Sequence, residues 1–323
     1  MTVLVTGAGG FIGGHLIGSL LRDRVSVRAV DVKPLTDWSQ LHAGAENISG
    51  DCSDLNVACS VSADVEQVFN LAADMGGMGF IETHKAECML SVLINTNMLR
   101  ASRQAGVESF FFSSSACVYA AEHQTDPNVT ALREADAYPA MPEDGYGWEK
   151  LFSERMCRHF REDFGMTTTV ARYHNVYGPD GTYDGGREKA PAAICRKVVE
   201  AVLFDRPEIE IWGDGEQTRS FMYVDDCVRG TRAIADLGDG DPINLGSSEL
   251  VTINELVSIV EDIAGITLER KYLLDAPQGV RGRNSDNTLF LKKHGWEPST
   301  SLRSGLERTY NWILAQVRER AVV

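Results

Sequence analysis

Tyr146 and Lys150 lie four residues apart, and their side chains could do acid–base chemistry together. Residues at positions i and i+4 share one face of a helix, so this spacing places an ammonium group beside a phenol. A phenol ordinarily has a pKa of about 10, and a neighbouring positive charge lowers it. We therefore expect Tyr146 to act as a base near neutral pH. Because Tyr-x-x-x-Lys pairs arise by chance in many helices, the interpretation needs support from the rest of the chain.

The N-terminus has the pattern of a dinucleotide-binding turn. A short apolar strand, Thr2–Thr6, runs into a glycine-rich segment and then into a helical stretch at His15–Leu21. The glycines allow a tight turn, let backbone N–H groups approach a pyrophosphate, and let the helix pack closely on the strand. The residues predicted to form this part of a cofactor site are Gly7, Gly10, Phe11, Ile12 and Gly13. The alternative, a glycine-rich surface turn, does not explain why strand, glycines, helix, strand and acidic residue occur in this order.

Asp31 ends the second apolar strand, Val25–Val30, and lies 18 residues after Gly13, where a ribose-binding carboxylate is expected. A carboxylate here favours a free ribose 2′-hydroxyl and therefore NAD over NADP, although Lys33 stands nearby. Asp51 follows the third strand region and is predicted to meet the adenine; the alternative is a solvated loop residue.

Apolar and helical segments alternate through the first 175 residues. Buried strands are predicted at Val65–Ala73, Ser109–Ser114 and Thr168–Tyr173, with helices near Leu90–Gln104 and Trp148–Phe164 between them. This alternation predicts an α/β fold, a Rossmann-type doubly wound parallel sheet.

After Tyr173 the pattern loosens into a loop rich in Gly, Pro, Asp and Tyr. Apolar segments return at Met222–Val224 and Ile243–Leu245, and helices are expected at Ile253–Ala264 and Leu302–Arg318. We predict that residues 1–175 form the NAD-binding domain, with 222–247 returning to it. Residues 176–221 and 248–323 would form a smaller substrate-binding portion above the strand ends.

Charge and composition exclude several functions. The formal net charge of −15 over 323 residues argues against a nucleic-acid partner. No apolar run is long enough to span a bilayer, and the chain begins directly in a strand, so neither membrane insertion nor a signal peptide is expected. The seven cysteines are scattered without a Cys-x-x-Cys pair, so neither a metal site nor a disulfide framework is indicated. Reduced thiols in the cytoplasm are the default expectation.

The glycine segment, Ser115 and the Tyr146/Lys150 pair together resemble the extended short-chain dehydrogenase/reductases that act on nucleotide sugars. Within that family the chain is similar to the GDP-mannose 3,5-epimerases over nearly its whole length. Five segments carry this resemblance: Ala72–Ile81, Ser114–Tyr119, Gly185–Ala193, Trp212–Phe221 and Gly279–Asn287.

The resemblance implies a reaction in which C4 of the sugar is oxidised to a ketone and later reduced again. A hexose C–H beside a hydroxyl is too weak an acid for a side chain to deprotonate, whereas a C4 ketone acidifies the hydrogens on C3 and C5. Tyr146 would take the C4-hydroxyl proton while NAD accepts the C4 hydrogen, with Ser115 holding that oxygen and Lys150 lowering the phenol's pKa. Cys117 and Lys189 match the family's acid/base pair, which would invert the carbons to give GDP-L-galactose, GDP-L-gulose or both.

The resemblance also implies a substrate site and an assembly. The expected substrate-binding residues are Gly76, Gly77, Met78, Ser115, Ala116, Cys117, Asn175, Glu188, Lys189, Ala190, Lys197, Gln217, Arg219 and Arg281. The arginines suit a diphosphate because the guanidinium is a planar fork of donors. A homodimer packed through the helices that contain Leu90 and Trp148 is implied as well.

Other interpretations remain open at this point. On position alone, Cys117 would be a small buried apolar residue and Lys189 a solvated loop lysine. A nucleotide-sugar 4-epimerase would need only Ser115, Tyr146 and Lys150, and a 5-epimerase would invert a single carbon. A 4,6-dehydratase should carry an Asp-Glu pair where this chain has Ala116-Cys117. A non-catalytic NAD-sensing protein would keep the glycine loop but lose the tyrosine, which is present here.

Overall fold

A seven-stranded parallel sheet lies at the centre of the molecule, which is described over residues 1–321 by a computed structural model. The strand order is β11-β6-β5-β4-β1-β2-β3. The bounds are β1 Thr2–Thr6, β2 Ser26–Asp31, β3 Glu46–Ser49, β4 Gln67–Asn70, β5 Ser109–Ser115, β6 Thr167–Tyr173 and β11 Ile243–Leu245. The predicted doubly wound α/β fold is therefore confirmed.

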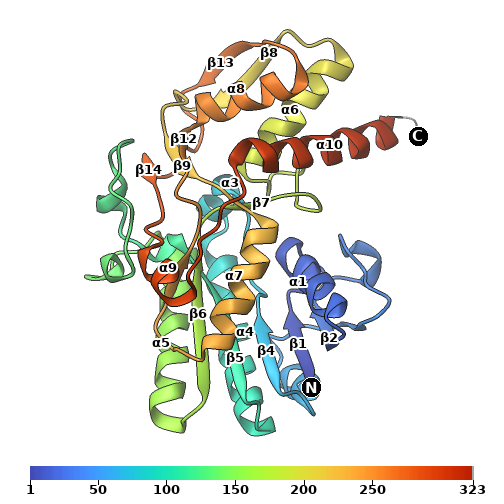
Figure 1. The fold of residues 1–323 in the computed structure, drawn as a ribbon, viewed down its shortest axis with the longest axis vertical. Coiled ribbons are helices and arrows are strands. Elements are labelled where there is room, and N and C mark those ends of the chain that lie inside the picture. The colour runs from blue at the N-terminus through green and yellow to red at the C-terminus, as the bar shows by residue number, and fades with distance from the viewer. Residues whose placement is uncertain (322–323) are drawn as a thin grey trace.

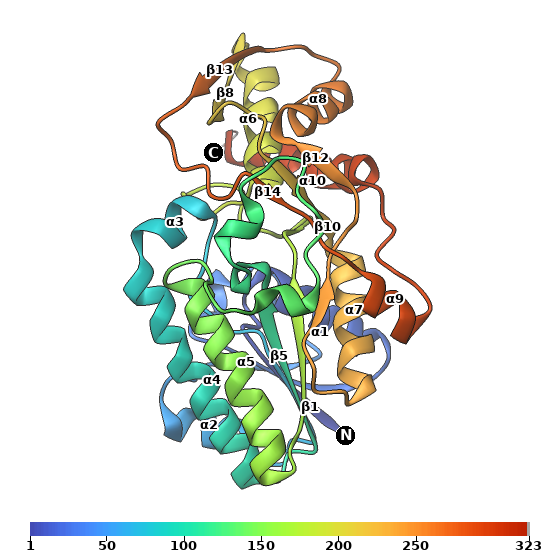
Figure 2. The same cartoon turned by 90° about the vertical axis from the view of Figure 1, so that its left-hand side faces the viewer.

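Helices cover both faces of this sheet (Figures 1 and 2). One face carries α2 (Leu55–Ser62), α4 (Lys85–Ala105) and α5 (Tyr146–Phe164), and the other carries α1 (Phe11–Arg22) and α7 (Val224–Leu237). The run Phe110–Phe112 in β5 shows why the central strands are continuously apolar. Phe110 and Phe112 pack in the core beneath α4 and α5, and Phe111 packs in the core on the other face.

A smaller portion lies above the carboxyl ends of the strands (Figure 1). Its helices are α3 (Met78–Thr83), α6 (Ala190–Phe204), α8 (Ile253–Ala264) and α10 (Leu302–Ala321), whereas α9 (Thr288–His294) contacts β11 at the edge of the central sheet (Figure 2). Its strands form three small sheets: β7 (Val176–Tyr177) with β10 (Met222–Tyr223), β8 (Glu208–Trp212) with β13 (Glu269–Leu273), and β9 (Thr218–Ser220) between β12 (Leu250–Thr252) and β14 (Gly282–Arg283). Because α6 contacts both α8 and α10, these helices form one packed layer.

Two details differ from the pattern expected from the sequence. The apolar segment at Met222 forms β10, which pairs with β7 outside the central sheet, whereas Ile243–Leu245 joins the sheet beside β6 as β11. The helix α6 has no counterpart among the predicted elements; it begins at Ala190, with Pro191 in its first turn, where a missing N–H costs nothing. The proposed division of the chain into domains stays a prediction.

Candidate functional site

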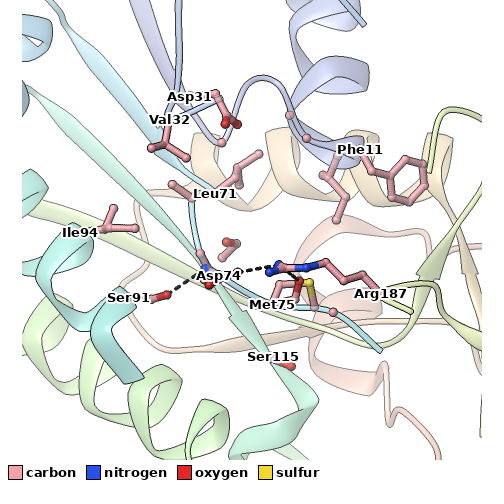
Figure 3. A pocket seen from close by; sticks show the side chains of 18 of the residues that line it. Phe11, Asp31, Val32, Leu71, Asp74, Met75, Ser91, Ile94, Ser115 and Arg187 are labelled. Atoms are coloured by element: carbon pink, nitrogen blue, oxygen red, sulfur yellow. Dashed lines mark hydrogen bonds and ion pairs between the residues drawn. The ribbon is translucent and has the colours of Figure 1, made fainter. Parts of the chain in front are cut away.

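A cavity of about 770 Å³ opens at the carboxyl ends of the central strands (Figure 3). This is the position at which ligands bind in doubly wound sheets. Its lining includes twelve of the residues proposed from the sequence: Gly7, Gly10, Phe11, Ile12, Gly13, Asp31, Asp51, Gly76, Ser115, Tyr146, Lys150 and Lys189. The structure thus brings the cofactor segment and four of the five proposed catalytic residues to one cavity.

The glycine segment forms a close turn between β1 and α1. Gly7 has φ +69°, and a Cβ at this position would lie 2.9 Å from the backbone N of Ala72; a Cβ at Gly13 would lie 2.2 Å from the carbonyl O of Gly7. Larger residues are therefore excluded at both positions. Helix α1 begins at Phe11 behind Gly10, which provides no side-chain cap, so the first N–H groups of the helix are available to a ligand. The site fits the pyrophosphate of a dinucleotide.

Asp31 lies on the cavity wall at the end of β2, where Figure 3 shows its carboxylate beside the glycine turn. The carboxylate accepts hydrogen bonds from the backbone N–H groups of Gly9 and Lys33, each at 3.0 Å. Asp51 also lines the cavity, and it accepts from the N–H of Ser53 at 2.8 Å. Both carboxylates retain acceptor capacity for the hydroxyl and amino groups of an adenosine.

Tyr146 is the first residue of α5, and Lys150 follows one turn later, so both side chains enter the cavity from the same helix. Both are buried, and the Lys150 ammonium lies 5.4 Å from the centre of the Tyr146 ring and 3.6 Å from a carboxylate oxygen of Glu149. Burial raises the pKa of Tyr146 well above its ordinary value, and a hydrogen bond with Ser115 opposes that rise. The structure therefore differs from the expectation that Lys150 alone makes this tyrosine a base, because desolvation of the phenol outweighs the neighbouring charge.

Cys117 lies behind Tyr146 in a short 3₁₀ turn, Ala116–Val118, whose first N–H groups are partly capped by the Ser115 hydroxyl. Cys117, Tyr146 and Phe80 belong to one buried cluster. Burial raises the pKa of the thiol to about 11, the Glu143 carboxylate adds to the rise, and the Arg283 guanidinium opposes it. The Arg283 Nη1 donates to the Cys117 Sγ at 3.7 Å.

Lys189 reaches the same region from the other portion of the molecule. It is the residue before the first turn of α6 and lines the cavity. Desolvation lowers the pKa of Lys189, and the charge of Cys117 opposes that shift. Lys189 thus lines the cavity that Ser115 and Tyr146 also line, and Cys117 belongs to the buried cluster that contains Tyr146.

The remaining residues proposed for substrate binding lie around α6 and the small sheets. Asn175 has φ +40° and donates to the carbonyl of Ser220 at 3.2 Å, while Lys197 donates to the carbonyl of Glu210 at 2.7 Å. Gln217 donates to the carbonyl of Trp212 at 2.8 Å. Ala116 is buried behind Ser115, Ala190 opens α6, and Glu188 forms an ion pair with Arg196 at 3.5 Å. None of these residues lines the main cavity.

Two loop contacts involve Gly77 and Met78. A Cβ at Gly77 would lie 2.4 Å from the carbonyl O of Glu188, so only glycine allows the two loops to approach this closely. Met78 packs against Gly279, whose Cβ position lies 3.2 Å from the methionine sulfur. These contacts join the loop after β4 to the smaller portion.

The arginines proposed to hold a diphosphate differ in their surroundings. Arg281 is paired with Asp214 at 2.9 Å. Arg219 donates only to backbone carbonyls, those of Thr218, Gln278 and Val280. Burial, together with the charge of Arg283, lowers the pKa of Arg219 to about 9. An anion beside Arg219 would offset that shift, so Arg219 is the better placed of the two for a phosphate group.

Several residues around the site could not be identified from the sequence. Arg283 and Glu143 contact each other and flank Cys117, and Arg283 also donates to the Gln124 side chain at 2.6 Å. Arg187 and Asp74 form an ion pair across the cavity wall. All four lie in or beside the segments that carry the family resemblance or the Tyr146 motif, but only a tertiary structure shows which of them meet.

Residues 3–246 match the NAD dependent epimerase/dehydratase family, and the chain belongs to it. The family confirms the predicted class of enzyme and the predicted use of NAD. Among solved structures, a UDP-glucose 4-epimerase from Thermotoga maritima with UDP-glucose has a TM-score of 0.88 at 28% identity, covering 98% of this chain and 100% of its own. A UDP-glucuronic acid 4-epimerase from Bacillus cereus, in complex with UDP-glucuronic acid and NAD, has a TM-score of 0.83 at 27% identity, with the same coverages.

The most specific similarity is to plant enzymes. The chain is 44% identical to GDP-mannose 3,5-epimerase 1 of Oryza sativa subsp. indica over 99% of its own length and 83% of that protein. It is 42% identical to GDP-mannose 3,5-epimerase of Arabidopsis thaliana over 99% of its length and 84% of the relative. This agrees with the resemblance seen in the five sequence segments.

Two further findings apply to residues 1–321. Within them, no helix is both long enough and apolar enough to cross a membrane. The same residues contain no group of three or more His, Cys, Asp and Glu side chains that could hold a metal ion.

Proposed function

We propose that this protein epimerises GDP-D-mannose at C3 and C5 through a transient 4-keto sugar, giving GDP-L-galactose, GDP-L-gulose or both. The observation that supports the proposal is that Lys189 lines the same cavity as Tyr146 and Ser115, while Cys117 packs in the buried cluster that contains Tyr146. A 4-epimerase would need no second acid/base pair in addition to Tyr146 and Lys150. The similarity to the plant epimerases supports the same substrate.

Oxidation at C4 uses the residues on α5 and at the end of β5. When bound, NAD would supply the reversible removal and return of the C4 hydrogen. Tyr146 would take the proton of the C4 hydroxyl, and Ser115 would hold that oxygen. Lys150 contributes the positive charge that favours the phenolate, which is needed because burial favours the neutral phenol.

Inversion uses Cys117 and Lys189. Once C4 is a ketone, one of the two side chains takes the proton from the neighbouring carbon and the other returns a proton on the opposite face of the ring. Burial favours the uncharged amine of Lys189, which can accept a proton, and the neutral thiol of Cys117, which can donate one. Arg219 and Arg281 would hold the diphosphate, so that the sugar reaches this pair.

Solvent labelling tests the proposal directly. In deuterated water with GDP-mannose as substrate, NMR should show deuterium at C5, and at C3 when that centre also inverts, with C4 unlabelled. Label only at C5 would identify a 5-epimerase that forms GDP-L-gulose. A 4-epimerase would label no carbon, a dehydratase would label C6, and a non-catalytic NAD-binding protein would leave the substrate unchanged. Absence of label at both C3 and C5 contradicts the proposal.

We also propose that the protein is a homodimer in the cytoplasm. Five large apolar side chains are exposed on the adjacent helices α4 and α5, and one of them, Leu90, also lines the cavity: Met89, Leu90, Leu93, Trp148 and Phe152. Exposed apolar side chains on two adjacent helices support association with a second copy. All seven cysteines are free, which suits a reducing compartment.

Light scattering tests the dimer, and cell fractionation tests the location. The unaltered protein should have twice the mass of one chain, and Leu90→Glu combined with Phe152→Glu should give the monomer. Leu41→Glu changes an equally exposed leucine away from these helices and should leave the dimer intact. A monomeric unaltered protein would contradict the proposed dimer.

A further inference from the structure

Lys189 follows a segment that contains a pair of glycines. Gly185 and Gly186 have φ values of +93° and +87°, and nothing lies within 4 Å of the position of a Cβ at either residue. Both conformations favour glycine, and the space around each Cβ position is open. The position of Lys189 therefore depends on what fixes the chain between Gly186 and the start of α6.

Two side chains hold this segment: Glu188 forms an ion pair with Arg196 on α6 at 3.5 Å, and Arg187 contacts the loop after β4. The Arg187 Nη1 donates to Asp74 Oδ1 at 2.6 Å and to the carbonyl of Met75 at 3.3 Å, as Figure 3 shows. Its guanidinium lies 3.7 Å from the centre of the Phe80 ring. The backbone carbonyl of Arg187 accepts from the N–H of Gly77 at 3.0 Å. Side chain and backbone thus tie the Lys189 segment to the loop after β4.

The segment after β4, which Arg187 contacts, is itself attached to the helices that cover the sheet. The backbone N–H of Asp74 donates to the Ser91 hydroxyl on α4 at 2.9 Å. Phe80, beneath the Arg187 guanidinium, belongs to the buried cluster that contains Cys117 and Tyr146. Arg187 therefore connects Lys189 to the same rigid surroundings that hold the other catalytic side chains.

We propose that Arg187 and Asp74 are positioning residues, whose ion pair sets the place of Lys189 relative to Cys117 for proton transfer at the sugar carbons. The inference rests on the proposed function. As a half-exposed ion pair, Asp74–Arg187 contributes little to folding stability. Its effect is on geometry, because a displacement of about 1 Å in a reacting group can slow a step by roughly a hundredfold.

Three variants test the proposal: Arg187→Gln, Asp74→Asn and the double variant. With NAD and GDP-mannose, deuterium incorporation at C5 should slow by about tenfold or more, while C4 oxidation, followed by the absorbance of reduced cofactor, should fall far less. Because both residues act through one ion pair, the double variant should be no slower than the slower single variant. Arg187→Lys keeps the charge and should recover part of the rate.

Amide hydrogen exchange gives a readout that does not depend on turnover. Peptides covering residues 184–190 should exchange faster in Arg187→Gln and Asp74→Asn than in the unaltered protein. Arg303→Gln removes another half-exposed ion pair, the one with Asp262, and should change neither exchange in this segment nor labelling.

Several results would overturn the inference. Equal losses of C4 oxidation and C5 labelling would make the pair a general structural contact, and a raised KM with unchanged kcat would make Arg187 a substrate ligand. Additive losses in the double variant would show that the residues act separately. If the unaltered protein itself fails to label C3 or C5, the proposed function fails; if it labels them and the variants match it, only the positioning inference fails.

Discussion

The two pairs of residues proposed to transfer protons are held in contrasting ways. Tyr146 and Lys150 lie one turn apart on α5, so a single helix fixes their relative position. Cys117 and Lys189 lie far apart in sequence, one in a 3₁₀ turn after β5 and the other before α6. The first pair needs only local structure, whereas the second needs tertiary contacts to bring it together.

The surroundings of the two pairs differ in the same way. Lys150 is held close to Tyr146 by its own helix, with Glu149 beside it. Cys117 lies against Arg283, and the segment of Lys189 is held by Arg187. Oxidation at C4 should therefore tolerate changes in the loops, and inversion at C3 and C5 should not.

The largest effect is expected for Tyr146→Phe. Without the phenol hydroxyl, no group takes the C4-hydroxyl proton, so the ketone on which every later step depends does not form. Turnover should fall by a factor of about 10²–10⁴, which is the contribution that a positioned acid or base makes to the rate. Neither reduced cofactor nor deuterium at C5 should appear, and a variant that still labels C5 would show that inversion does not need C4 oxidation.

Cys117→Ala should separate the two pairs. Tyr146 and Lys150 remain, so C4 should still be oxidised and reduced cofactor or 4-keto sugar should accumulate. Inversion should slow by about 10²-fold or more, because one member of the acid/base pair is lost. Parallel absorbance and NMR measurements check this, and near-normal epimerisation would mean that the thiol only packs against Tyr146 and Phe80.

The sequence predicts the locally determined parts of the molecule well. Apolar runs separated by helical patterns place six of the seven strands of the sheet near their observed positions, including Ile243–Leu245, which forms β11. The strand β8 is not a continuous apolar run: its residues alternate between charged and apolar, as in a half-buried strand, and its partner β13 lies far along the chain. The helix α6 was missed because its start follows an irregular glycine-rich loop.

The same distinction applies to the site. The spacing of Tyr146 and Lys150 can be recognised in the sequence alone. The same is true of the order of strand, glycines and helix at the N-terminus. The contact of Arg283 with Cys117 and that of Arg187 with Asp74 join distant segments and leave no periodic pattern. The resemblance to known epimerases predicts a role for Arg281. Only the folded chain shows that Arg283, two residues later, contacts the thiol of Cys117.

Asp31→Ala tests the proposed NAD site. Like the Tyr146/Lys150 pair, this site is predicted from a local sequence pattern. If the carboxylate accepts the adenosine ribose hydroxyls, its loss should weaken NAD binding by about 1.5–3 kcal/mol, as for a hydrogen bond to a charged group. Binding of NAD and NADP to cofactor-stripped protein, measured by calorimetry, checks this. Preference for NAD over NADP should also fall, because Lys33 remains close to the ribose position. Tighter binding of NADP by the unaltered protein would contradict the assignment.

The smallest effect is expected on the pKa of the Cys117 thiol. Two variants should shift this pKa in opposite directions. The Glu143 carboxylate raises the pKa of this thiol and the Arg283 guanidinium lowers it. Glu143→Gln should therefore lower the pKa, so that alkylation of Cys117 by iodoacetamide begins at lower pH. Arg283→Met should raise the pKa and move alkylation to higher pH, each shift being on the order of one unit. Mass spectrometry of the Cys117 peptide follows the reaction, with Cys117→Ser marking alkylation at the other thiols.

Shifts in the same direction for both variants would show that packing around Cys117, and not the two charges, controls the pKa of the thiol. In that case the contrast between a pair set by one helix and a pair set by distant residues would hold for geometry but not for electrostatics.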